Sequence, residues 1–154
     1  MAMDPLRIAA LAALALACAI VALTNWQLHA LRPSFLAPQF TYSRQAFDAI
    51  VSRWSAAQLA AYRRLLRADF VTLGCYAAFG WLWVAGSGQH EPGLLAWVLP
   101  AAALFDAVEN ALHLRFTRPV APASADGWHL AAGLASALKF ALIGAFAGAA
   151  VLGA

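Results

Sequence analysis

Four apolar stretches, each long enough for roughly 20 residues of helix, take up most of this 154-residue chain and limit what it can fold into. They are residues 7–29, 67–86, 93–114 and 128–152. Only 11% of the residues are charged, compared with about a quarter in soluble domains. Inside a bilayer, a helix satisfies all of its own backbone hydrogen bonds. The sequence therefore predicts an all-α fold, an integral membrane four-helix bundle, as a single domain over residues 1–154.

The longest connection joins the first two stretches and has a helical pattern of its own. Its apolar residues follow helical spacing against a face of Arg and Gln, which is typical of a helix at the membrane interface. Ser55 and Gln58 have the form of a capping box. We therefore expect an amphipathic interfacial segment over about 43–65, with a short helix over about 43–53 and a second helix that starts near Ala56 and continues into the second span. Such a segment serves either as a solvated cover or as a lid that gates a site.

Arginine is distributed unevenly between the connections. Eight arginines follow the first and third stretches, namely Arg32, Arg44, Arg53, Arg63, Arg64, Arg67, Arg115 and Arg118. The opposite side has only Arg7, and residues 86–92 contain no Lys or Arg. The positive-inside rule then places both termini outside and the arginine-rich connections in the cytoplasm. The net charge of +3 is thus explained by membrane topology, and no nucleic-acid partner is predicted.

A polar stripe interrupts the third apolar stretch. Asp106, Glu109, Asn110 and His113 lie at i, i+3, i+4 and i+7, so a helix presents all four on one face. One ionised side chain at mid-membrane costs roughly 2.5 to 3.5 kcal/mol on insertion scales. A stripe of this kind therefore predicts a functional site within the membrane.

Polar residues of the other spans are expected at the same end of the bundle as this stripe. Asp69 opens the second span, and Lys139, the only lysine, lies well inside the fourth. A lysine at that depth should pair with Asp106 or Glu109. If both carboxyl groups share the lysine, one of them is expected to keep a proton and would suit proton transfer. A purely structural salt bridge between two helices is the alternative.

The candidate site residues fall into two groups. The candidates for catalytic roles are Asp69, Asp106, Glu109, Asn110, His113 and Lys139. The candidates for substrate binding are Arg64, Arg67, Tyr76, Phe79, Phe105, Trp128 and Phe140. The aromatic members of the second group could shelter a cationic intermediate. Together they predict a pocket that opens toward the cytoplasm, with polar residues at its mouth and aromatic residues deeper in.

Three histidines are also expected at the end of the bundle that carries the polar stripe. His29, His113 and His129, with Asp69, supply ligand types that suit zinc or iron. Their spacing matches no established metal motif, and each can simply be a polar helix end. No metal is therefore predicted, and the sequence identifies no cofactor.

The order of these residues resembles a group of small four-span bacterial membrane proteins that carry an Asp-x-x-Glu-Asn motif in the third span. The matching positions, within about residues 40–145, are Tyr42, Tyr62 to Arg64, Asp69, Tyr76, Pro100, Asp106, Glu109, Asn110 and Lys139. The segment before the second span departs from the pattern, because it reads Ala-Ala-Tyr-Arg-Arg and lacks a Gly-Arg pair. The resemblance implies that Asp69, Asp106, Glu109, Asn110 and Lys139 belong to one site, and it implies no particular activity. The expected location is the bacterial inner membrane, as a multi-pass protein.

Gly144 and Gly148 form a small-xxx-small pair in the fourth stretch. Close packing within the bundle explains such a pair, and so does a homodimer interface.

Three kinds of function are compatible with this pattern, and a membrane lipid or a hydrophobic small molecule is the expected partner. An enzyme would use the carboxyl groups for acid–base chemistry on a lipid or isoprenoid-like substrate. A proton- or cation-coupled transporter, or a lipid-translocating protein, would use them as relays and would need a dimer to complete the path. A small assembly or regulatory partner would use them only to fix helix packing. An apolar cavity beside the carboxyl groups favours the enzyme, and polar continuity favours the transporter.

Overall fold

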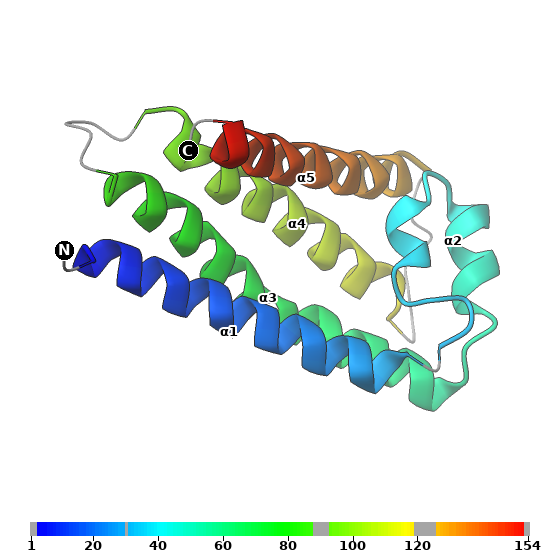
Figure 1. Cartoon of the computed structure of the whole chain (residues 1–154). Helices are drawn as coiled ribbons and strands as arrows, with labels where there is room; N and C mark the ends of the chain where they lie inside the picture. The colour runs from blue at the N-terminus through cyan, green and yellow to red at the C-terminus, as the bar shows by residue number, and fades with distance from the viewer. Residues whose placement is uncertain (1–2, 30, 88–92, 119–125, 153–154) are drawn as a thin grey trace.

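The computed structural model describes residues 3–29, 31–87, 93–118 and 126–152, and it is all-helical, without strands, over these ranges (Figure 1). Its elements are α1 (Pro5–Leu28), the 3-10 helix η1 (Ala37–Phe40), α2 (Arg44–Val51), α3 (Ala56–Ala85), α4 (Leu95–Phe116) and α5 (Asp126–Leu152). Four of them, α1, α3, α4 and α5, are long and apolar enough to cross a membrane. The predicted all-α bundle with four candidate spans is confirmed, and it indicates a multi-pass membrane protein.

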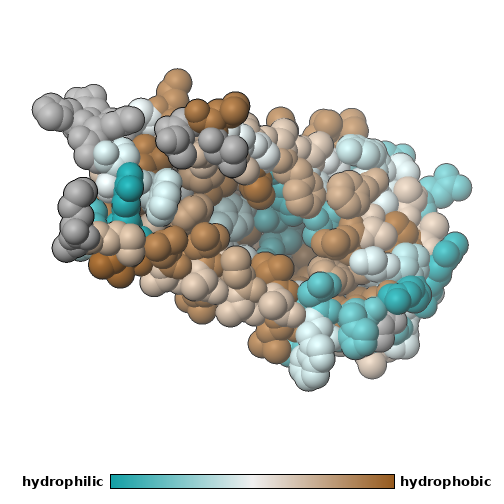
Figure 2. Space-filling view, in the orientation of Figure 1, coloured by the Kyte–Doolittle hydropathy of each residue, from teal (hydrophilic) through white to brown (hydrophobic). Residues whose placement is uncertain are grey.

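The four long helices pack in chain order. Helix α3 lies against both α1 and α4, and α4 also lies against α5. The start of α1 and the end of α5 lie at one end of the bundle, and η1 and α2 lie at the opposite end, which we call the α2 end (Figure 1). Figure 2 shows that one face is hollowed, with hydrophilic residues at the bottom of the hollow and hydrophobic residues around it. The hydrophilic residues at the bottom of this hollow are therefore reached from a side of the bundle.

The starts of α2 and α3 are set by side-chain caps. Ser43 accepts a hydrogen bond from the backbone of Ala46, so α2 begins one residue later. Ser55 and Gln58 form both bonds of a capping box at the start of α3. The predicted short helix and the predicted second helix starting near Ala56 are both confirmed, and α3 continues without a break into the second span.

The segment between α1 and α3 folds over the α2 end of the bundle. Phe47 of α2 is 1% exposed and contacts the rings of His113, Phe116 and His129. At the base of the segment, the indole of Trp54 packs on Tyr62, and its Nε1 donates a hydrogen bond to the carbonyl oxygen of Pro33 at 3.0 Å. The segment is therefore joined to the bundle by buried aromatic contacts.

Close approach of the chain to α5 explains Gly133. A Cβ added to this glycine would lie 2.5 Å from Cδ1 of Tyr42 and 2.6 Å from the carbonyl oxygen of Thr41. Nothing lies within 4 Å of a Cβ added to Gly144 or Gly148. Gly133 therefore admits the segment after η1, whereas the predicted packing role of Gly144 and Gly148 within the bundle is not seen among the described residues.

Replacing Gly133 with Ala is expected to lower the free energy of unfolding by about 1–3 kcal/mol, because the added methyl group overlaps the Thr41 backbone. Gly144→Ala is the matched control, and it should be neutral or stabilising because Ala favours a helix over Gly by about 1 kcal/mol. The midpoints of thermal unfolding in detergent micelles compare the two variants. Equal midpoints for both variants would contradict the close contact at Gly133.

Candidate functional site

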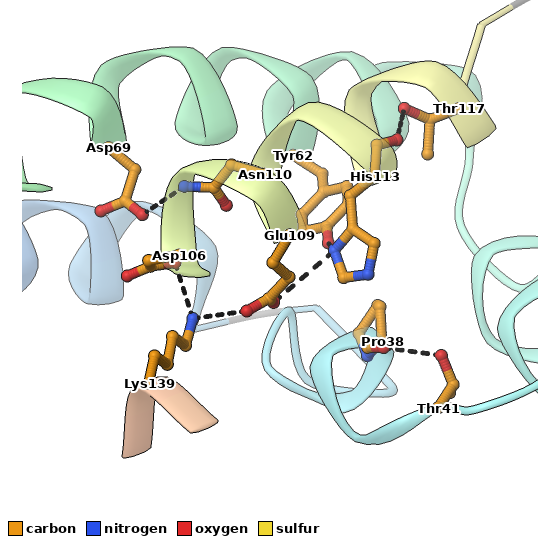
Figure 3. Close-up of polar contacts among 10 residues, drawn as sticks. All are labelled: Pro38, Thr41, Tyr62, Asp69, Asp106, Glu109, Asn110, His113, Thr117 and Lys139. Atoms are coloured by element: carbon orange, nitrogen blue, oxygen red, sulfur yellow. Dashed lines mark hydrogen bonds and ion pairs between the residues drawn. The ribbon is translucent and has the colours of Figure 1, made fainter. Parts of the chain in front are cut away.

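A buried lysine joins two carboxyl groups of α4 at the centre of the candidate site (Figure 3). The Nζ atom of Lys139 lies 2.7 Å from Oδ1 of Asp106 and 2.7 Å from Oε2 of Glu109. All three residues are buried. Asp106 and Glu109 lie three residues apart on α4, so they present their carboxyl groups to the same side of α5. The predicted pairing of Lys139 is confirmed, and it involves both carboxyl groups.

Helix α3 contributes a third carboxyl group and a phenol to the same cluster. Asn110 donates a hydrogen bond from Nδ2 to Oδ2 of Asp69 at 2.9 Å. The hydroxyl of Tyr76 donates to Oδ2 of Asp106 at 3.3 Å. Asp69 and Tyr76 lie seven residues apart, so two turns of α3 place them on one stripe facing α4. Both are half-buried, whereas Asn110 is fully enclosed.

The cluster continues toward the α2 end through His113. Its Nδ1 lies 3.0 Å from the hydroxyl of Tyr62 and 3.8 Å from Oε1 of Glu109. Both His113 and Tyr62 are buried, and Phe47 lies over the imidazole ring. A chain of polar contacts thus runs through the bundle from Tyr76 to Tyr62. Its members in order are Tyr76, Asp106, Lys139, Glu109, His113 and Tyr62.

Tyr62 is absent from the residues that the sequence pattern singles out as the site. A signal for it exists, because Tyr62, Asp69 and Tyr76 repeat every seven residues and so share one stripe of α3. Thr72, three residues after Asp69, is also buried among them. Its hydroxyl lies beside the Asp69 carboxyl group, to which it can donate a hydrogen bond.

Two adjoining cavities open on the hollowed face (Figure 2). The first, which we call the polar cavity, measures about 360 Å³ and is lined by groups from α1, η1, α3, α4 and α5. Its polar lining residues are Thr24, Asn25, Gln39, Asp69, Thr72, Tyr76, Asp106 and Lys139. The second, the apolar cavity, measures about 490 Å³. The two are continuous along one groove, because Val21, Asn25, Thr72, Tyr76 and Ile143 line both.

Of the other aromatic residues predicted to bind substrate, two line the cavities and two do not, over the described part of the chain. Phe79 lines the apolar cavity, and Phe140 lines the polar cavity and stacks on Phe40 with ring centroids 5.8 Å apart. Phe105 lines neither cavity among the described residues. Trp128 is exposed beneath the guanidinium of Arg115.

The two predicted arginines are both exposed on α3. Arg64 lines a separate depression between α1 and α3, together with Gln27. Arg67 lines neither the polar nor the apolar cavity as far as the chain is described. Both arginines are therefore near the α2 end of the groove and outside its polar lining.

The three histidines are not brought together. His113 and His129 both contact Phe47, and His129 also stacks on Phe116 with ring centroids 3.9 Å apart. His29 is exposed at the end of α1. Within the described ranges, no three His, Cys, Asp or Glu side chains are grouped so that they could hold a metal ion.

The charges of the cluster do not balance if every group is ionised. Asp69, Asp106 and Glu109 are three carboxyl groups beside a single ammonium, that of Lys139. Together they carry a net charge of −2, and a proton on one carboxyl group lowers this to −1 and so reduces the cost of an unpaired buried charge. The site can therefore hold a proton close to the cavity, which is the requirement for general acid–base chemistry.

Comparisons of the chain with protein-family models, with curated proteins and with solved structures found no match.

Proposed function

We propose that the protein binds the apolar chain of a membrane lipid or isoprenoid-like molecule in the groove and carries out acid–base chemistry on its polar end. One observation supports this most directly: Asp69, Asp106 and Lys139 line a cavity that is continuous with an apolar one. Volumes of about 360 and 490 Å³ are within the range of pockets that bind small molecules, roughly 300 to 1,000 Å³. A molecule with a polar head and an apolar tail fits this division.

The contacts suggest a role for each charged group. Asp106 lines the polar cavity, so a proton on its carboxyl group can be passed to a bound molecule, and Asp69, which lines the same cavity, can accept one. Lys139 holds Asp106 in place and compensates its charge when the proton leaves. Glu109 and His113 are behind Asp106, away from the cavity lining, and can resupply the proton.

The lining of the groove favours this function over ion or proton transport. Beyond Asn25, Thr72 and Tyr76, the apolar cavity is lined by aliphatic and aromatic residues and by Cys18, none of them charged. A transport path would need polar groups across the whole bundle. The apolar half instead offers the contacts that a hydrocarbon chain makes.

We also propose a placement in the membrane and a group of relatives. The eight arginines after the first and third spans belong to the α2 end, so the positive-inside rule puts that end in the cytoplasm of a bacterial inner membrane and both termini outside. The segment over 43–65 would then lie at the cytoplasmic interface and cover the site. The order of Tyr, Asp and Lys residues supports membership of the four-span bacterial group with the Asp-x-x-Glu-Asn motif.

The function is tested by incubating a total bacterial lipid extract with purified protein and following individual lipids by mass spectrometry. Wild type is compared with Asp106→Asn and with Asp48→Asn, an exposed carboxylate that pairs with Arg44 on α2. Because general acid catalysis contributes about 10²–10⁴-fold, Asp106→Asn should slow conversion of the substrate lipid by at least about 10²-fold. Asp48→Asn should convert it at the wild-type rate.

Native mass spectrometry of the same samples separates the alternatives. A lipid that co-purifies with wild type but is never converted would contradict the enzyme and favour lipid translocation. If neither a bound lipid nor conversion is found and the protein is folded, the cluster only fixes helix packing.

A further inference from the structure

We infer that the polar cavity selects a lipid whose head carries a positively charged amine, in preference to a neutral or a phosphate head. This inference rests on the proposed function, because it names the chemistry of the molecule that the groove would bind. The polar cavity is lined by hydrogen-bond acceptors that the contacts among Asp69, Asp106 and Lys139 do not use up.

The ammonium group of Lys139 is already paired with carboxyl groups of the protein itself. Two of its three ammonium hydrogens point to Asp106 and Glu109, each at 2.7 Å. It is also buried, with 4% of its surface exposed. The single cation of the polar cavity is therefore used to hold two carboxyl groups and is poorly placed to bind an anionic head.

Asp69 has capacity to spare and is open to the cavity. Its Oδ2 accepts one hydrogen bond from Asn110, and the Thr72 hydroxyl is a second side-chain hydrogen-bond partner, so about two of the roughly four acceptor sites of the carboxylate stay free. The residue is half-buried and lines the polar cavity, in contrast to the enclosed Glu109. An ionised carboxylate only accepts hydrogen bonds, so the ligand must donate them, and charge-assisted donors bind most strongly.

Thr72 provides a second acceptor for the ligand, beside Asp69. It is 5% exposed and lines both cavities at their junction. Its hydroxyl lies beside the Asp69 carboxyl group, to which it can donate a hydrogen bond, and the lone pairs of its oxygen are then free to accept one. A donor group placed beside Asp69 could therefore bind to Thr72 as well.

The charge around the cavity acts in the same direction. Three carboxyl groups and one ammonium give the cluster a net charge of −2 or, with one proton bound, −1. A phosphate would face carboxylates of the same sign in a poorly solvated place, whereas an ammonium would face the opposite sign. The exposed Arg64 lies outside this lining, in the separate depression between α1 and α3.

The test uses three probes that differ only in their heads: hexadecylamine, hexadecanol and hexadecyl phosphate. Their dissociation constants are measured with the full chain in detergent micelles by competition against a fluorescent hexadecyl probe. Wild type should bind the amine about tenfold or more tightly than the other two, because a charge-assisted hydrogen bond is stronger than a neutral one.

Two variants then locate the selectivity. In Asp69→Asn, the amide oxygen can still accept the bond from Asn110, so the fold should be kept, whereas the preference for the amine should fall to about threefold or less. The affinity for hexadecanol should stay the same. Asp48→Asn, which removes an exposed carboxylate, should keep the wild-type preference.

The outcomes distinguish this inference from the proposed function. Equal binding of amine and alcohol by wild type, tighter binding of the phosphate, or an unchanged preference in Asp69→Asn would each overturn the inference and leave the lipid groove standing. If folded wild type binds none of the three probes, the groove does not hold a hydrocarbon chain, and the proposed function fails with it.

Discussion

Lys139→Met is expected to lower the free energy of unfolding by about 3–5 kcal/mol, the cost of removing one partner of a buried ion pair. Lys139 is the group that lies within 2.7 Å of both Asp106 and Glu109, and all three residues are buried. Without the ammonium, two neighbouring carboxyl groups are left with like charges in a poorly solvated interior. The midpoint of thermal unfolding and the denaturant dependence of unfolding in micelles measure the loss.

A triple variant shows whether the loss comes from charge or from packing. Lys139→Met combined with Asp106→Asn and Glu109→Gln keeps the shapes of the side chains and removes every charge of the ion pair. Neutral replacement of a buried ion pair is often tolerated, so the triple variant should recover most of the stability that Lys139→Met loses. Equal losses in the single and triple variants would show that packing of the lysine stem, and not the unpaired carboxylates, sets the cost.

Much of this site can be predicted from spacing alone. Asp106, Glu109, Asn110 and His113 lie on one face because the helical period puts i, i+3, i+4 and i+7 together, whatever surrounds the helix. The partner of Lys139 is also predictable, because an isolated charge in a membrane span is too costly to leave unpaired. Local caps such as Ser55 and Gln58 fix helix starts through residues three positions apart.

The positions of the predicted aromatic substrate-binding residues relative to the groove could not be predicted from spacing alone. Each helical residue is turned by about 100° from the one before it, so the burial of Asp106 does not bury Phe105 next to it. In the same way His129 is buried and Trp128 is exposed. Residue type alone indicates that an aromatic ring suits a lipid pocket, but the rotation of the helix decides whether the ring reaches it.

Contacts of the segment before α3 were beyond prediction for a different reason. Phe47 meets His113, which is 66 positions later in the chain, and Tyr42 meets Gly133. Nothing in the local pattern of either segment identifies its partner, because such contacts depend on how separate helices are placed. The pattern predicted an amphipathic segment, and the bundle determined what its apolar face covers.

Phe47→Ala is expected to lower the free energy of unfolding by about 3–5 kcal/mol and to loosen the α2 end in particular. The ring is 1% exposed and contacts His113, Phe116 and His129 at once, so its removal leaves a cavity above the imidazole of His113. Hydrogen exchange of α2 should accelerate more than that of α3, because few other buried contacts hold α2. Thermal unfolding in micelles gives the global loss.

Phe40→Ala is the matched control, since Phe40 lies in the same connection but is 59% exposed. It should change the midpoint of unfolding by far less, and the exchange of α2 should stay near the wild-type rate.

The hydrogen exchange of α2 in wild type and in Phe47→Ala also decides between a fixed cover and a lid. If α2 exchanges rapidly in wild type, and Phe47→Ala changes neither this exchange nor the stability, the segment already opens freely and acts as a lid. If exchange of α2 is slow in wild type and Phe47→Ala accelerates it, the buried ring holds the segment in place as a cover over His113. A bound molecule then reaches the carboxyl groups through the groove on the side of the bundle.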